Sequence, residues 1–142
     1  MIVPDVNLLV HAYATGSSRH DDARRWWKGT LDSQVAVGLA WVAIIGYVRI
    51  ITNARFMKPA QTVETAEADV RAWLACRNVV VVHPTERHAD LVFGFLRSAG
   101  AAGNLTTDAH LAALAVEHDA EIASADADFS RFPGVRSTNP LA

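Results

Sequence analysis

The run VVVVHP at residues 79–84 constrains the fold more than any other part of the sequence. Its four consecutive valines are β-branched and offer no polar face, and His83-Pro84 then ends the run. Such a strand is typical of a parallel sheet whose two faces are covered by helices. We expect the other strands of this sheet at four shorter runs, namely 2–4, 35–37, 122–124 and 135–137.

The segments between these runs have the spacing of helices. Between residues 42 and 52, apolar side chains such as Val42, Ile45 and Val48 recur every three or four residues, which predicts a helix with one broad buried face. The same pattern predicts helices at 8–13, 19–28, 62–74, 85–100 and from 104 or 107 to 118. Strands that alternate with helices predict an α/β fold, a three-layer α/β/α sandwich around a mainly parallel sheet of four or five strands.

Length and composition predict a single compact domain over residues 1–142. The hydrophobic fraction is 51%, and no linker, repeat or low-complexity tract divides the chain. The formal net charge is −2, so no global positive field indicates a nucleic-acid binder. A nucleic-acid substrate would have to be held by a local cationic patch or by a bound metal ion.

The sequence predicts neither export nor membrane insertion. Cys76 is the only cysteine, so no disulfide can form within the chain, which fits a reducing compartment. No basic segment precedes an apolar run at the amino terminus. The longest weakly charged stretch, 33–48, is shorter than the roughly 20 residues of a membrane span. We therefore expect a soluble cytoplasmic protein with no membrane partner.

Four aspartates follow strands or begin helices where chemistry is expected. Asp5 follows the first strand, Asp126 and Asp128 follow the fourth, and Asp108 lies near the start of the helix before that strand. In parallel sheets, ligands bind outside the carboxyl ends of the strands, so these side chains should meet at one edge. Clustered carboxylates repel each other unless a cation neutralises them, and their oxygens suit Mg²⁺ or Mn²⁺. Such an ion can activate water and neutralise charge on a phosphodiester.

Each aspartate also has a local explanation. Asp5 could cap the helix that begins at Val6. Asp108 could answer the positive end of a helix dipole, and the pair at 126 and 128 could form an ordinary turn. The coincidence of all of them at one sheet edge favours a metal site.

Three motifs resemble the PIN-domain nucleases, and within them the VapC-type toxins of bacterial toxin–antitoxin pairs. The motifs are VPDVNLLV (3–10), TDAHLAALA (107–115) and SADADF (124–129), and the similarity extends over nearly the whole chain, including 41–52 and 139–141. The resemblance implies a Mg²⁺- or Mn²⁺-dependent endoribonuclease. It also implies a homodimer that is held inactive by a VapB-type antitoxin.

Carried over by position, the resemblance implies specific roles. Asp5 and Asp108 would be the core metal ligands, Asp126 would complete the acidic site, and Asp128 would lie beside it. The family commonly has a glutamate in the helix after the second strand, but this chain has Gly46 there and no acidic residue between Asp32 and Glu64. The number of metal ions, one or two, therefore stays open.

Other side chains leave alternatives open. Asn7 could hydrogen-bond a metal ligand or a bound water, or be an ordinary amide at a helix start. Arg49 could hold a substrate phosphate or cover its helix as a surface arginine, and we expect it, with Arg55 and Lys58, near the acidic edge. Because Trp26 and Trp27 are adjacent, a helix cannot bury both equally, and one of the two could meet a partner.

Three competing functions are compatible with an α/β chain rich in aspartate. A phosphoacceptor receiver needs an aspartate after its third strand, where this chain has His83-Pro84. A haloacid-dehalogenase-type phosphatase needs Asp-x-Asp after the first strand, where this chain reads Asp5-Val6-Asn7. The serious alternative is a non-catalytic PIN-like scaffold that binds RNA or protein, which the missing glutamate suggests.

Overall fold

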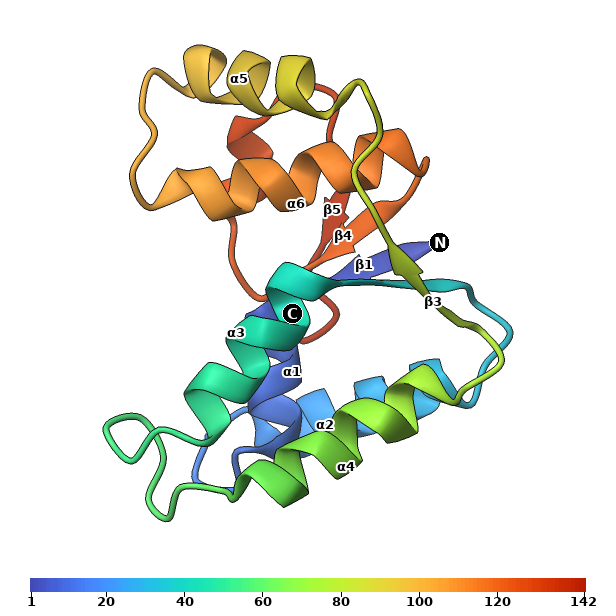
Figure 1. The fold of residues 1–142 in the computed structure, drawn as a ribbon, viewed down its shortest axis with the longest axis vertical. Helices are drawn as coiled ribbons and strands as arrows, with labels where there is room; N and C mark the ends of the chain where they lie inside the picture. The colour runs from blue at the N-terminus through green and yellow to red at the C-terminus, as the bar shows by residue number, and fades with distance from the viewer.

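The computed structural model describes residues 1–142, and Figure 1 shows a central sheet with helices on both sides. All five strands are parallel, in the order β3-β2-β1-β4-β5. The strands are β1 (Ile2–Pro4), β2 (Val37–Ala40), β3 (Val79–Val82), β4 (Glu121–Ala123) and β5 (Ser137–Thr138). The helices are α1 (Val6–Tyr13), α2 (His20–Leu31), α3 (Trp41–Ile51), α4 (Val63–Leu74), α5 (His88–Ala99), α6 (Leu105–Glu117) and the 3₁₀ helix η1 (Asp128–Arg131). The predicted α/β sandwich is confirmed.

Each face of the sheet carries its own apolar core. In β2, Val37 and Leu39 point into the core formed with α1 to α4, whereas Ala40 joins the core formed with α5 and α6. Figure 1 shows these two groups of helices on opposite sides of the sheet. Both faces are therefore covered, which explains why the strands are apolar without alternation.

The prediction of the second strand at 35–37 is wrong, because the strand occupies Val37–Ala40. Val35 is exposed, while Leu39 is completely buried. Gly38 concealed the strand, since glycine usually weakens one. Here it is required: a Cβ at Gly38 would lie 2.8 Å from Val82 Cγ1 and 2.9 Å from Met1 Sδ.

Three other element boundaries depend on tertiary contacts. The helix predicted from residue 85 begins at His88, because the Thr85 amide and hydroxyl both donate to Glu117. The alternative start at residue 104 is confirmed for α6, which has Asn104 as its N-cap. The last strand lies at Ser137–Thr138 and not at 135–137, since Val135 packs against the α5–α6 core.

None of the helices combines the length and the apolarity that a membrane crossing requires.

Candidate active site

Asp5 joins the end of β1 to the start of α1. Its backbone N–H donates to the carbonyl of Ala123 at 2.8 Å, which fixes it against β4. Its Oδ1 accepts from the N–H of Val6 at 2.7 Å, so Asp5 is the N-cap of α1. Its Oδ2 accepts from the Ser124 hydroxyl at 2.8 Å. Asp5 is therefore both a helix cap and a carboxylate at the carboxyl edge of the sheet.

Ser124 connects the two strand ends, and sequence reasoning assigned it no role. Its hydroxyl donates to Asp5 Oδ2 and accepts from the backbone N–H of Asp126 at 2.9 Å. It also accepts from the Asn7 side-chain amide at 3.3 Å. Ser124 is almost completely buried. The available signal was its position directly after β4, the strand that pairs with β1.

The Asn7 side chain contacts the loop that carries Asp126 and Asp128, but not the carboxylates of these aspartates. Besides its bond to Ser124, its Oδ1 accepts from the backbone N–H of Ala125 at 3.3 Å. The two contacts tie the first turn of α1 to the loop that follows β4. These contacts support a role for Asn7 in positioning the loop after β4, and they do not fit an ordinary amide at a helix start.

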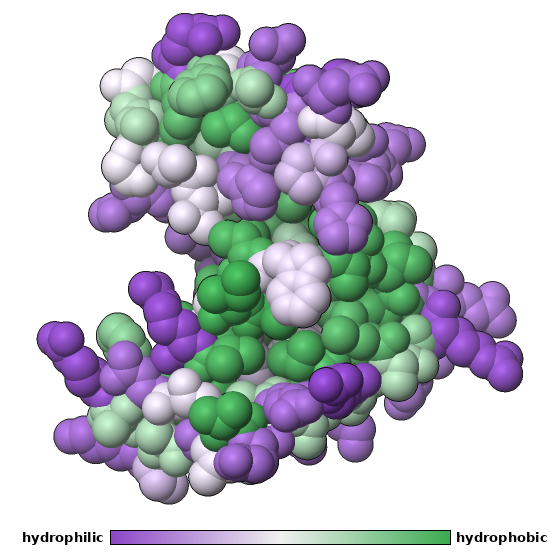
Figure 2. All heavy atoms as spheres, in the orientation of Figure 1, coloured by the Kyte–Doolittle hydropathy of each residue, from purple (hydrophilic) through white to green (hydrophobic).

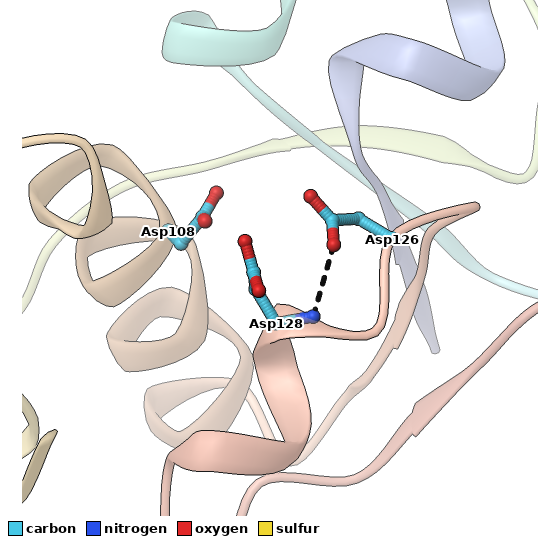
Figure 3. Close-up of side chains that lie close together, drawn as sticks. All are labelled: Asp108, Asp126 and Asp128. Atoms are coloured by element: carbon cyan, nitrogen blue, oxygen red, sulfur yellow. Dashed lines mark hydrogen bonds between the residues drawn. The ribbon is translucent and has the colours of Figure 1, made fainter.

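Asp108, Asp126 and Asp128 converge, as Figure 3 shows. One carboxylate oxygen of each lies within 4.8 Å of the others. Asp108 projects from the first turn of α6, Asp126 from the loop after β4, and Asp128 from the start of η1. The backbone N–H of Asp128 donates to Asp126 Oδ1 at 3.0 Å, which holds the loop in a tight turn.

The fourth predicted aspartate, Asp5, lies outside this trio but interacts with it electrostatically. Burial raises the pKa of Asp5, and the charge of Asp126 adds to that rise, while the bonds from Ser124 and Val6 oppose it. Partial burial, followed by the charges of Asp5, Asp126 and Asp128, raises the pKa of Asp108 to about 6. The four carboxylates thus form one acidic centre.

The donor set fits a hard divalent cation. All four ion pairs of the structure lie elsewhere, so no lysine or arginine compensates these carboxylates. The pKa of Asp108 is raised first by partial burial and then by like charges that no cation compensates. Oxygen donors from three segments, partly open to solvent, are what Mg²⁺ or Mn²⁺ binds while keeping water ligands.

Gly46 has a packing reason to be glycine. A Cβ at this position would lie 3.0 Å from Val6 Cγ2, so α1 and α3 approach each other closely just beside Asp5. A glutamate side chain at this position would meet α1. The acidic centre draws its carboxylates from α6, from the loops that follow β1 and β4, and from the start of η1.

The cations predicted at the acidic edge are spread along α3 and beyond it. Arg49 is exposed on the last turn of α3. Arg55 and Lys58 follow the end of that helix, which starts at the sheet edge and is roughly 16 Å long at 1.5 Å per residue. The expectation that all three lie near the edge is therefore wrong for Arg55 and Lys58.

The chain matches the model of the PIN domain family over residues 2–135. The protein belongs to the PIN-domain family. It is 43% identical to Ribonuclease VapC33 of Mycobacterium tuberculosis over 141 residues, 99% of both chains. It is 44% identical to Ribonuclease VapC37 of the same organism over 142 residues, 100% of this chain and 99% of the other. The resemblance to the VapC proteins is thereby confirmed.

Solved structures share the fold of this PIN-domain chain. VapC20 of Mycobacterium tuberculosis, a sarcin-ricin loop cleaving toxin, superposes with a TM-score of 0.70 at 20% identity, covering 96% of this chain and 99% of that one. A toxin-antitoxin complex from Klebsiella pneumoniae contains a chain with a TM-score of 0.65 at 16% identity, covering 99% and 98%. At these identities the likeness concerns the fold alone.

Proposed function

We propose that the protein is the toxin of a type II toxin–antitoxin pair and hydrolyses RNA phosphodiester bonds as a Mg²⁺- or Mn²⁺-dependent endoribonuclease. The observation that carries the proposal is the trio Asp108, Asp126 and Asp128 at the carboxyl edge of the sheet, without any cationic partner. RNA as the substrate is supported by relatives that match the whole chain at 43% and 44% identity and are named ribonucleases. A nuclease of this kind would act in the cytoplasm.

The metal ligands are proposed to come from Asp5, Asp108 and Asp126, with Asp128 beside them. The distances favour Asp128 as a further ligand, since its carboxylate is one of the three that converge. When bound, the ion supplies a Lewis acid for the phosphodiester and a water of lowered pKa. Ser124 and Asn7 keep the ends of β1 and β4 in register, so that the carboxylates stay in place.

The proposed protein partner is a VapB-type antitoxin. The support is the fold shared with a chain of a toxin-antitoxin complex and the family of the full-length relatives. On α2, Trp27 is buried, whereas its neighbour Trp26 stays partly exposed. Trp26 is therefore the tryptophan we assign to an apolar helix of the partner.

The proposed homodimer would form over α3 and β3. Trp41 and Ile45 are one turn apart on α3 and are 48% and 61% exposed, and Val80 of the edge strand β3 is 49% exposed. Figure 2 shows a broad hydrophobic region over these elements. A second copy of the same face would cover both the apolar side chains and the open strand edge.

The experiment that tests the proposed function is cleavage of single-stranded RNA by the purified protein. We expect cleavage with Mg²⁺ or Mn²⁺ and none after chelation by EDTA. RNA binding without cleavage under any divalent ion would instead support the non-catalytic scaffold. Cleavage that persists in EDTA would contradict the assigned metal dependence.

A further inference from the structure

A pocket of about 390 Å³ lies at the far end of α1 and α3. Its walls include Val10 and His11 from α1, Ile51 from the end of α3, and Phe56 and Lys58 from the segment that joins α3 to α4. This volume is in the range of small-molecule sites. The acidic centre uses none of these residues.

The lining combines an aromatic ring with polar groups. Phe56 is 61% exposed, although it is a large apolar side chain. His11 uses Nδ1 in a hydrogen bond with Ser17 Oγ at 2.8 Å, and Nε2 has no protein partner. Gln61 adds a side-chain amide to the lining. An aromatic face with polar groups beside it matches a flat heterocycle that has donors and acceptors on its edge.

The charge around the pocket is positive. No aspartate or glutamate is among its lining residues, whereas Lys58 lines it and Arg55 lies in the same exposed segment. Burial lowers the pKa of His11, and the nearby guanidinium of Arg19 lowers it further. His11 therefore adds no positive charge at physiological pH, and the cation that lines the pocket is Lys58.

One face of α1 leads from the acidic centre to this pocket. Asn7, which contacts the loop that carries Asp126, and His11 are four residues apart and share a face of the helix. His11 is six positions after Asp5, roughly 9 Å along the helix axis. The neighbouring α3 runs from the sheet edge to the segment at 52–62 (Figure 1), and exposed Arg49 is in its last turn.

We propose that this pocket receives an unpaired base of the RNA substrate a few nucleotides from the scissile phosphate, with Phe56 stacking on the base and Lys58 contacting an adjacent phosphate. The inference rests on the proposed ribonuclease function and deepens it. Stacking on an aromatic side chain is available to every base, and the polar groups of His11 and Gln61 would select among bases. The absence of carboxylates from the lining favours a polyanion over a basic protein segment.

The test uses short single-stranded RNAs that carry 2-aminopurine at successive positions. They are bound by the Asp108→Asn protein, so that cleavage does not deplete them. We expect the fluorescence of 2-aminopurine to be quenched at one or two positions. This quenching should disappear in Phe56→Ala and persist in Phe56→Trp. Phe56→Ala should weaken RNA binding roughly five-fold to a hundred-fold. Lys58→Ala should reduce the slope of log affinity against log salt by about 1.

The chain offers matched controls for both substitutions. Phe93 on α5 is 60% exposed, and Lys28 on α2 is the other lysine of the sequence. Phe93→Ala and Lys28→Ala should leave the quenching and the salt dependence unchanged. Wild-type protein that cleaves RNA while Phe56→Ala keeps full affinity and quenching would overturn the pocket assignment alone. If Phe56→Ala weakened only the complex with the antitoxin, the pocket would bind a protein segment and not RNA. Wild-type protein that neither binds nor cleaves RNA would overturn both proposals.

Discussion

At the scale of single residues, Asp108 is the carboxylate whose ionisation is most clearly disfavoured by the site. Its carboxylate is partly buried and faces the charges of Asp5, Asp126 and Asp128, which together raise its pKa to about 6 from an ordinary value of 3.8. Because the folded protein holds this proton more tightly than the unfolded chain does, the native state is favoured at low pH. The contribution is lost as pH rises through the interval from about 4 to about 6.

The pH dependence gives the first prediction. In EDTA, Asp108→Asn should melt at a higher temperature than wild type at pH 7, because the amide removes one of the repelling charges. Toward pH 3.5 the difference should become small, since Asp108 is then protonated in the folded state and mostly protonated in the unfolded state. Thermal unfolding across pH 3.5 to 7.5 measures the difference. A difference that does not change with pH would contradict the raised pKa.

A second residue-scale prediction concerns Ser124. Ser124→Ala would remove the donor to Asp5 Oδ2 and the acceptor for Asn7 and for the N–H of Asp126. We expect a loss of about 1–3 kcal/mol in the free energy of unfolding, from buried groups left without partners. Cleavage should fall roughly 10- to 100-fold, as is typical when a group that orients metal ligands is lost.

The control for Ser124 is Ser98→Ala on α5. Ser98 is exposed and its hydroxyl forms no hydrogen bond within the protein, so stability and activity should stay at wild-type values. If denaturant unfolding and cleavage were the same for Ser124→Ala as for Ser98→Ala, the connecting role of Ser124 would be wrong.

At the scale of elements, β2 is a strand whose position depends on a tertiary contact that the local sequence pattern does not reveal. Gly38 occupies a strand position where a Cβ would lie 2.8 Å from Val82 Cγ1 and 2.9 Å from Met1 Sδ. Gly38→Ala should therefore destabilise the protein by about 1–3 kcal/mol through overpacking. Gly29, within α2, has no atom within 4 Å of its ideal Cβ, so Gly29→Ala should stabilise by up to about 1 kcal/mol. Denaturant unfolding compares the two, and equal effects would contradict the close contact at β2.

The sequence was sufficient wherever a local signal and the fold agreed. The four valines of β3 predicted a sheet covered on both faces. The rule on strand ends correctly predicted that Asp5, Asp126 and Asp128 lie at one edge. The second strand was misplaced because the reason for Gly38 lies in Val82, more than forty residues away. Ser124 and the pocket beside Phe56 were missed because their partners come from segments that only folding brings together.

At the scale of the whole molecule, two groups of helices cover the two faces of one sheet, and the proposed active site lies at the carboxyl edge of that sheet. Neither group of helices covers the exposed apolar side chains of α3 and β3. If the proposed homodimer forms, Ile45→Asp should convert it to monomer, because a charge would be buried between two copies of the face. Light scattering over a concentration series measures the mass. Val63→Asp, at a similarly exposed position on α4, is the control and should leave the dimer intact.

The measurement that tests the central claim most directly is the rate of RNA cleavage, in Mn²⁺, by folded wild type and by Asp108→Asn. The substitution keeps the shape of the side chain and deletes one charge of the acidic trio. We predict a loss of kcat/KM larger than the roughly 10- to 100-fold expected for Ser124→Ala, because Asp108 would touch the metal itself. Asp108→Asn protein that is folded and cleaves RNA at the wild-type rate would contradict the account.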